Sequence, residues 1–81
     1  MKDLPFRIDE IYIPTARRKT VDPERVAELA ESMLEEGQKT PIMVRDDGKR
    51  LILVDGLQRL EAAKSLGEET IIGIKVQARK R

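Results

Sequence analysis

The alternation of apolar and polar positions along the chain predicts two helices and four strands. The clearest segment is residues 23–36, where apolar side chains recur three and four positions apart, as on one face of a helix. Asp22 is suited to the N-cap of this helix, and Pro23 is suited to its first position. Gly37 is suited to the position at which the helix ends. We expect the apolar face to join the core and the acidic face to be solvated. The apolar positions are Val26, Leu29, Ala30, Met33 and Leu34, and the acidic ones are Glu24, Glu28, Glu31 and Glu35.

A second helix is expected after Gly56, because apolar residues again follow a helical spacing and Gly67 suits the position after the last turn. Two adjacent alanines allow this helix to pack closely against a neighbour. Its expected apolar positions are Leu57, Leu60, Ala63 and Leu66.

The expected strands are short apolar or alternating segments bounded by turn residues. Two of them flank Asp47-Gly48, a strong hairpin signal, and should therefore pair antiparallel. Residues 15–20 show no periodicity and are expected to form a loop. In chain order, the expected strands are residues 6–14, 41–45, 51–54 and 70–76.

These elements follow the order β-α-β-β-α-β, which predicts a single α+β domain over residues 1–81, with two main helices covering a small mixed β-sheet. A chain of 81 residues has room for one core only. The basic end, residues 77–81, is expected to fray. Exposed edges in so small a sheet make a homodimer plausible.

Composition excludes several kinds of chemistry. The chain has no cysteine and no histidine, so disulfides, thiol catalysis, most zinc sites and imidazole acid–base catalysis are ruled out. Sixteen basic and fifteen acidic residues leave a net charge of +1, so the chain lacks the overall positive field of a protein that grips duplex DNA. No apolar run is long enough to cross a bilayer, and the first residues lack a secretory signal. We expect a cytoplasmic protein with no membrane partner.

The most informative segment joins an apolar strand directly to a helix through Asp55-Gly56. A helix that begins at glycine presents unpaired N–H groups and the positive end of its dipole, which favours phosphate or another anion. Arg59 adds a fixed positive charge. The alternative is a purely structural interpretation, in which Asp55 is the N-cap, Gly56 serves the backbone geometry and Arg59 lies in solvent.

Three other segments could take part in binding. Residues 37–42 lead from the first helix into a strand and could read a base edge, although a plain loop is the more frequent outcome. A basic triplet at 17–19 suits phosphate, because arginine binds it bidentately, and a basic tail at 79–81 could tether nucleic acid. Solvated charge runs are the alternative for both. The cations concerned are Arg17, Arg18, Lys19, Arg79, Lys80 and Arg81.

Two carboxylates are catalytic candidates. Asp55 lies beside the expected anion site and could help hold Mg²⁺ together with substrate phosphates, although a capping role is simpler. Glu61 follows near Arg59 and could serve a phosphotransferase, although an exposed helical carboxylate is the commoner case.

The order of these motifs resembles the N-terminal domain of the ParB family, whose superfamily also includes sulfiredoxin and the free serine kinases. Each motif is loose, but their order and spacing cover nearly the whole chain. The matching segments are Ile11-Tyr12-Ile13-Pro14, Arg18-Lys19, the helix at 26–33, residues 36–45 and residues 53–67.

The resemblance implies a nucleotide-binding fold that takes a nucleoside triphosphate, ATP or CTP, together with Mg²⁺. In this family the Gly-x-x-Arg turn takes the phosphates, the segment before the Pro-Ile strand lines the base, and an arginine of the early loop reaches the phosphate side. Carried over to this chain, the nucleotide-binding residues are Arg18, Gln38, Lys39, Thr40, Pro41, Gly56, Leu57, Gln58 and Arg59.

The departures from the family patterns are also informative. Segregation-type ParB proteins carry Gly-Glu-Arg-Arg at this turn, so Leu57 and Gln58 remove a carboxylate and a guanidinium, which argues against CTP hydrolysis. Sulfiredoxins place a reactive cysteine here, so sulfinic acid reduction is excluded. Serine kinases share Asp-Gly-x-x-Arg, but their motif histidine is Gln58 here. No helix-turn-helix is expected after Val76.

The leading hypothesis is therefore a nucleotide-binding domain that acts as a binding or regulatory module, with a link to plasmid or chromosome partition or to transcriptional regulation. The first alternative is a phosphotransferase or weak NTPase using Asp55 or Glu61 with a metal. The second is a nucleic-acid accessory protein that uses the basic triplet and tail, with DNA or a DNA-binding protein as its partner.

Overall fold

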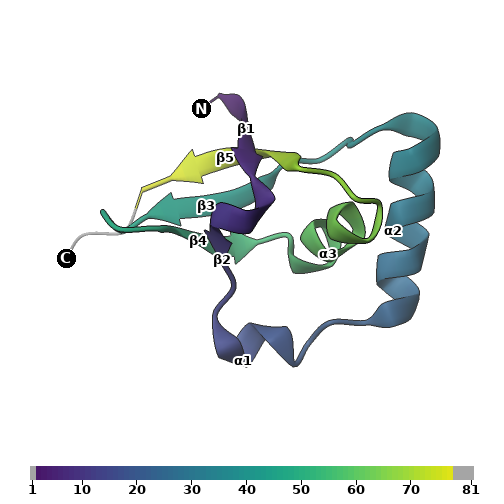
Figure 1. Cartoon of the computed structure of the whole chain (residues 1–81), viewed down its shortest axis with the longest axis horizontal. Helices are drawn as coiled ribbons and strands as arrows, with labels where there is room; N and C mark the ends of the chain where they lie inside the picture. The colour runs from purple at the N-terminus through teal and green to yellow at the C-terminus, as the bar shows by residue number, and fades with distance from the viewer. Residues whose placement is uncertain (1, 78–81) are drawn as a thin grey trace.

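A computed structural model of the chain describes residues 2–77, which form a five-stranded mixed sheet with the two longer helices at one side of it (Figure 1). The predicted α+β class is confirmed. The elements are β1 (Asp3–Arg7), the 3-10 turn η1 (Ile8–Glu10), β2 (Ile11–Tyr12), α1 (Thr15–Arg18), α2 (Pro23–Glu36), β3 (Ile42–Asp46), β4 (Leu51–Asp55), α3 (Leu57–Ser65) and β5 (Thr70–Val76).

The strands lie in the order β1-β5-β3-β4-β2. The β1–β5 and β3–β4 pairs are antiparallel, whereas β5–β3 and β4–β2 are parallel. The hairpin predicted around Asp47-Gly48 is therefore correct. Asp47 accepts hydrogen bonds from the N–H groups of Lys49 (2.9 Å) and Arg50 (3.0 Å), which fix this turn. The topology places the carboxyl end of β4 next to the helices (Figure 1).

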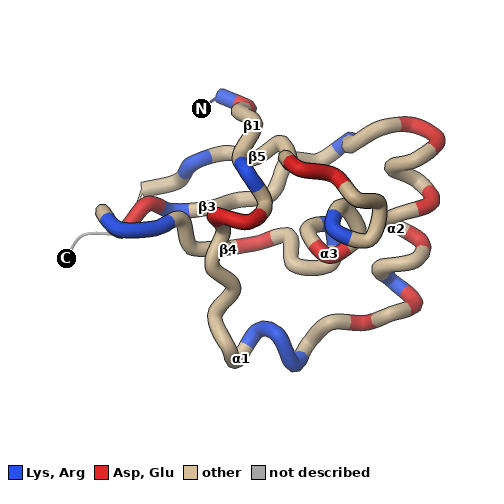
Figure 2. Tube along the Cα trace, in the orientation of Figure 1, with Lys and Arg blue, Asp and Glu red and all other residues tan. Residues whose placement is uncertain are grey.

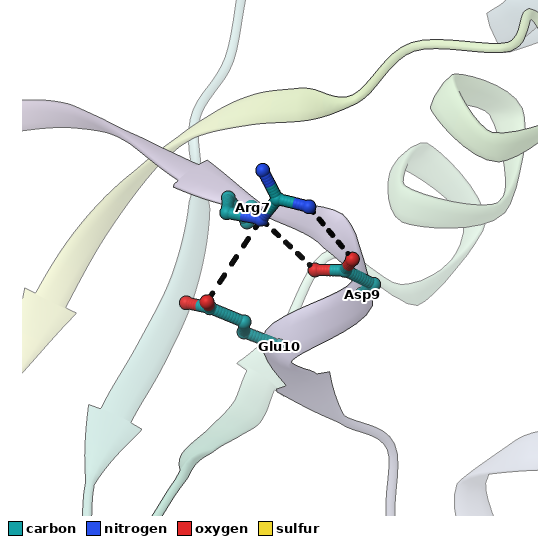
Figure 3. A network of polar contacts seen from close by, with 3 residues as sticks. All are labelled: Arg7, Asp9 and Glu10. Atoms are coloured by element: carbon teal, nitrogen blue, oxygen red, sulfur yellow. Dashed lines mark hydrogen bonds and ion pairs between the residues drawn. The ribbon is translucent and has the colours of Figure 1, made fainter.

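The single strand predicted over residues 6–14 is wrong. Its two halves are β1 and β2, which lie at opposite edges of the sheet, and η1 carries the chain between them. Buried Ile8 lies at this crossing, and its N–H donates to the Glu69 carbonyl at 3.0 Å. Arg7 pairs with Asp9 at 2.9 Å and with Glu10 at 3.8 Å across the same turn (Figure 3).

The loop predicted at residues 15–20 is also wrong at its start, because Thr15–Arg18 form one helical turn, α1. Pro14 precedes this turn in an extended conformation, and its carbonyl accepts from the Arg17 N–H at 2.9 Å. A single turn buries no residue, so it leaves no apolar periodicity in the sequence.

The core lies between the sheet and α3, and its most deeply buried large side chains are Ile42, Val44, Leu53, Leu60 and Ile71. Helix α3 contacts β3 and β5, while α2 packs on α3 as an outer layer (Figure 1). The expectation that both helices cover the sheet therefore holds for α3 only. The predicted apolar face of α2 joins the core only in part, because none of its residues is fully buried and Leu34 is 75% exposed, whereas Met33 packs against the core cluster. The other three predicted apolar positions, Val26, Leu29 and Ala30, are partly buried.

Within residues 2–77, no helix combines the length and the apolar character needed to cross a membrane.

Candidate functional site

The turn between β4 and α3 depends on a glycine in the left-handed conformation. Gly56 has φ 104° and ψ 28°, and a Cβ at this position would lie 2.6 Å from Cγ2 of Ile42. The strand can enter the helix this abruptly only because Gly56 has no side chain. Asp55 ends β4, and its Oδ1 accepts from the Gly56 N–H at 3.0 Å.

The start of α3 has no side-chain cap. The N-cap is Gly56, so the possible capping role of Asp55 is wrong. The first internal hydrogen bond runs from the Leu60 N–H to the Gly56 carbonyl at 2.9 Å. The amides of residues 57–59 precede it and have no acceptor within the helix, so this end carries a partial positive charge.

A hollow of about 320 Å³ lies beside this helix start. Three arginines from three different helices line it, together with one carboxylate, which gives the lining a net positive charge. Such an arrangement suits a phosphate group, which accepts from guanidinium and from backbone N–H groups together. The lining residues are Arg17, Thr20, Arg25, Leu29, Asp55, Gly56, Leu57, Gln58 and Arg59.

The basic triplet is divided between two environments. Arg17 is half-buried, donates to the Val54 carbonyl at the end of β4 and lines the hollow. Arg18, which the resemblance assigned to phosphate, donates to the Ile13 carbonyl at 3.2 Å and is not among the lining residues. Lys19 is exposed outside the hollow as well. The structure thus brings the neighbour of the expected arginine to the site.

Gln58 connects α3 to the segment that joins α1 and α2. Its Oε1 accepts from the Asp22 N–H at 2.9 Å, and its Nε2 donates to the Thr20 carbonyl at 2.8 Å. Both ends of the amide are therefore used within the protein. Leu57 is 6% exposed and belongs to the core, so its side chain forms a wall and its backbone N–H is the group available to a ligand.

Arg59 and Arg25 differ in their partners. The half-buried Arg59 forms no ion pair with any residue of the described part of the chain. Arg25 lies 3.6 Å from Glu28 on the exposed side of α2. Arg59 is therefore the guanidinium most available to a bound anion.

The segment expected to line a base, residues 38–41, does not line this hollow. Gln38 instead joins β5, donating to the Ile72 carbonyl at 2.7 Å and accepting from the Ile72 N–H at 2.8 Å. Lys39 pairs with Glu36 at 2.7 Å, Thr40 is exposed and Pro41 is half-buried. The structure places these four residues with the end of α2 and the start of β3.

The two catalytic candidates do not meet in one site. Asp55 lines the hollow, whereas Glu61 pairs with Lys64 at 3.4 Å beside a separate apolar depression at the start of α2. Among residues 2–77, no cluster of three acidic residues could hold a metal. Asp55 could supply one carboxylate ligand to a Mg²⁺ ion whose other ligands are phosphate and water oxygens. Arg79, Lys80 and Arg81, the proposed nucleic-acid tether, lie outside the described residues.

Sequence reasoning missed three lining residues, Thr20, Arg25 and Leu29. Arg25 and Leu29 are four residues apart and therefore share one face of α2. The single arginine on an otherwise acidic helix was a usable signal, but its role depends on how α2 lies against α3.

Comparison with known proteins supports the same fold. A family model described as the ParB N-terminal domain matches residues 6–81. The chain is 41% identical over 68 residues to the probable chromosome-partitioning protein ParB of Campylobacter jejuni, covering 83% of this chain and 24% of that protein. It is 41% identical over 73 residues to stage 0 sporulation protein J of Bacillus subtilis, covering 83% of this chain and 26% of that protein. The chain spans about a quarter of the length of these relatives.

Solved structures agree with this relationship. Sulfiredoxin from Arabidopsis thaliana superimposes with a TM-score of 0.87 at 26% identity, over 96% of this chain and 88% of that one. The C-terminally truncated chromosome-partitioning protein ParB of Caulobacter crescentus, complexed with CTP-gamma-S, gives a TM-score of 0.82 at 24% identity, over 99% of this chain and 47% of that one.

Proposed function

We propose that this chain, which belongs to the ParB N-terminal domain family, binds the phosphates of a nucleoside triphosphate in the hollow at the start of α3. The observation that carries this proposal is the convergence of three guanidinium groups and the uncapped start of α3 on one cavity. No single motif supplies these groups, because they come from α1, α2 and α3.

The physical basis is electrostatic. A triphosphate carries several negative charges, and the lining offers three permanent positive charges against the single carboxylate of Asp55. Amide hydrogens at a helix start add directed donors that cannot be titrated away. Because Gly56 has no side chain, a phosphate oxygen can approach the backbone closely.

CTP is the first nucleotide to test, and ATP the second. The Caulobacter crescentus relative was solved with CTP-gamma-S, and its likeness to this chain extends over the whole fold. Magnesium would be held mainly by phosphate oxygens and water, with Asp55 as the one carboxylate at the hollow.

We propose a binding or regulatory role for the bound nucleotide. Leu57 belongs to the core and Gln58 is hydrogen-bonded at both ends of its amide, so neither side chain is available to activate a water molecule. The partition role of the relatives is the biological setting that we propose for this activity.

Isothermal titration with CTP and ATP, with and without Mg²⁺, tests the proposal. Replacing Arg59 by alanine should weaken CTP binding about tenfold, since a charge-assisted hydrogen bond to phosphate contributes roughly 1.5–3 kcal/mol. Lys49→Ala is the matched control, because Lys49 is an exposed cation in the turn before β4, at the end opposite the hollow. The proposal is contradicted if neither CTP nor ATP gives heat of binding. It is also contradicted if the Arg59 and Lys49 variants lose the same amount of affinity for CTP.

A further inference from the structure

A second hollow, of about 350 Å³, lies between the end of α2 and the start of β5. It shares no lining residue with the hollow at the start of α3. Five of its nine lining residues are apolar, namely Met33, Leu34, Leu66, Ile71 and Ile72. We refer to it as the α2–β5 groove.

Two large apolar side chains that line the α2–β5 groove are exposed. Leu34 is 75% exposed and Ile72 is 36% exposed, and they are two of the four large apolar side chains that are exposed within residues 2–77. The other two, Leu4 and Met43, do not line it. A cluster of exposed apolar side chains beside a cavity is typical of a protein-binding surface.

The rim of the groove is acidic. Helix α2 carries five glutamates and one arginine, although the whole chain has a net charge of +1. Glu31 lies one helical turn before Leu34, and Glu68 lines the groove itself. Figure 2 shows acidic segments along α2 and on the connection between α3 and β5, and both of these segments contribute lining residues to the groove.

Some of these carboxylates are paired within the protein, Glu28 with Arg25 at 3.6 Å and Glu36 with Lys39 at 2.7 Å. Within the part of the chain that the structure describes, no ion pair involves Glu31, Glu35 or Glu68. An exposed apolar floor beside these three unpaired carboxylates is complementary to a segment that combines apolar and basic side chains.

We propose that the α2–β5 groove docks an amphipathic segment of a partner protein, with its apolar side chains on Leu34 and Ile72 and its lysines or arginines on the acidic rim. Long basic side chains suit this rim because their aliphatic stems cover apolar surface while their charged ends reach carboxylates. The inference does not depend on nucleotide binding, because the two hollows are separate.

The test uses the whole chain, labelled with ¹³C at methyl groups and ¹⁵N at amides. The probe is a synthetic peptide of leucine and lysine residues with helical spacing, and its matched control replaces every lysine with glutamate. We expect the basic peptide to shift the signals of Met33, Leu34 and Ile72, and the acidic peptide to leave them unchanged.

Two variants examine the floor and the rim separately. Leu34→Gln should weaken peptide binding about tenfold, because the bound peptide would no longer cover an apolar leucine side chain at this position. Leu4→Gln is the control, since Leu4 is an exposed apolar residue on β1 outside the groove. The double replacement Glu31→Gln and Glu35→Gln should weaken binding about threefold and reduce its dependence on salt.

The proposal is overturned if the basic peptide causes no shifts, if its shifts lie outside the groove, or if the acidic peptide binds equally well. It is also overturned if the groove signals change with protein concentration alone, because the occupant would then be a second copy of the chain. Chemical shifts away from the replaced residue establish that each variant remains folded.

Discussion

Gly56 is the residue on which the geometry of the hollow at the start of α3 depends most closely. Its replacement by alanine combines two costs, a left-handed backbone at φ 104° and a contact of 2.6 Å between the new Cβ and Cγ2 of Ile42. We expect Gly56→Ala to lower the free energy of unfolding by about 3 kcal/mol, as the sum of backbone strain and overpacking. Urea denaturation measures this loss.

Gly67→Ala is the matched control for the replacement of Gly56. Gly67 also has a positive φ of 77°, but nothing lies within 4 Å of a Cβ placed there. Only the cost of the left-handed backbone remains, so we expect Gly67→Ala to lower the free energy of unfolding by about 1 kcal/mol. Equal losses in the two variants would show that Ile42 does not restrict this turn.

Asp47 gives a prediction for acid stability. The N–H groups of Lys49 and Arg50 donate to its carboxylate and lower its pKa below the ordinary value. Folding therefore favours the charged form, so its contribution to stability is complete above the ordinary pKa of about 4 and is lost as the pH falls below it. Asp47→Asn should be less stable than the unaltered chain at pH 7, and the difference should shrink between about pH 4 and pH 2. Thermal melts across this pH range measure the difference in stability between Asp47→Asn and the unaltered chain. A difference that stays constant with pH would contradict this role of Asp47.

Helix α2 is the longest element of the described chain, and it lies in the outer layer of the fold, packed on α3. It has no buried residue, and glutamines hold both of its ends, Gln58 at the segment before it and Gln38 at the segment after it. Local opening is easiest where few side chains are buried. Because α2 supplies Arg25 to the hollow at the start of α3, local opening of α2 would remove one arginine from the candidate site.

Gln58→Leu should release the start of α2, because it removes two hydrogen bonds to the backbone of Thr20 and Asp22. We expect a loss of about 1 kcal/mol in stability and faster hydrogen exchange over residues 20–30, with the exchange of β3 and β4 nearly unchanged. Mass spectrometry of exchanged peptides measures this. Uniform acceleration across the chain, or none at α2, would contradict the role assigned to Gln58.

The elements differ in how well the sequence predicted them. The bounds of α2 follow from local signals, Asp22, Pro23 and Gly37, and these were confirmed. The first strand was wrong because its two halves pair with different partners, β5 and β4, and pairing partners are not encoded in a local alternation. Leu34 was misplaced because periodicity identifies an apolar face without showing how much of that face a neighbour covers.

The molecule as a whole combines a sheet and α3, which enclose the core, with an outer layer that completes the lining of the hollow at the start of α3. The turn of residues 55–59 could be identified in the sequence because strand, glycine and arginine are adjacent. Arg25 could not, because its place at the hollow depends on the packing of α2 on α3. The same packing leaves the α2–β5 groove on a separate part of the surface.

The central claim is that the amides at the start of α3 and the surrounding arginines receive the phosphates of a nucleotide. A titration of the ¹⁵N-labelled chain with CTP in the presence of Mg²⁺ tests it most directly, with cytidine as the control that lacks phosphate. We expect CTP to shift the backbone signals of residues 56–59 and the side-chain signals of Arg17 and Arg59, and cytidine to leave them in place. Unchanged signals at residues 56–59 with CTP, or equal shifts with cytidine, would contradict the account.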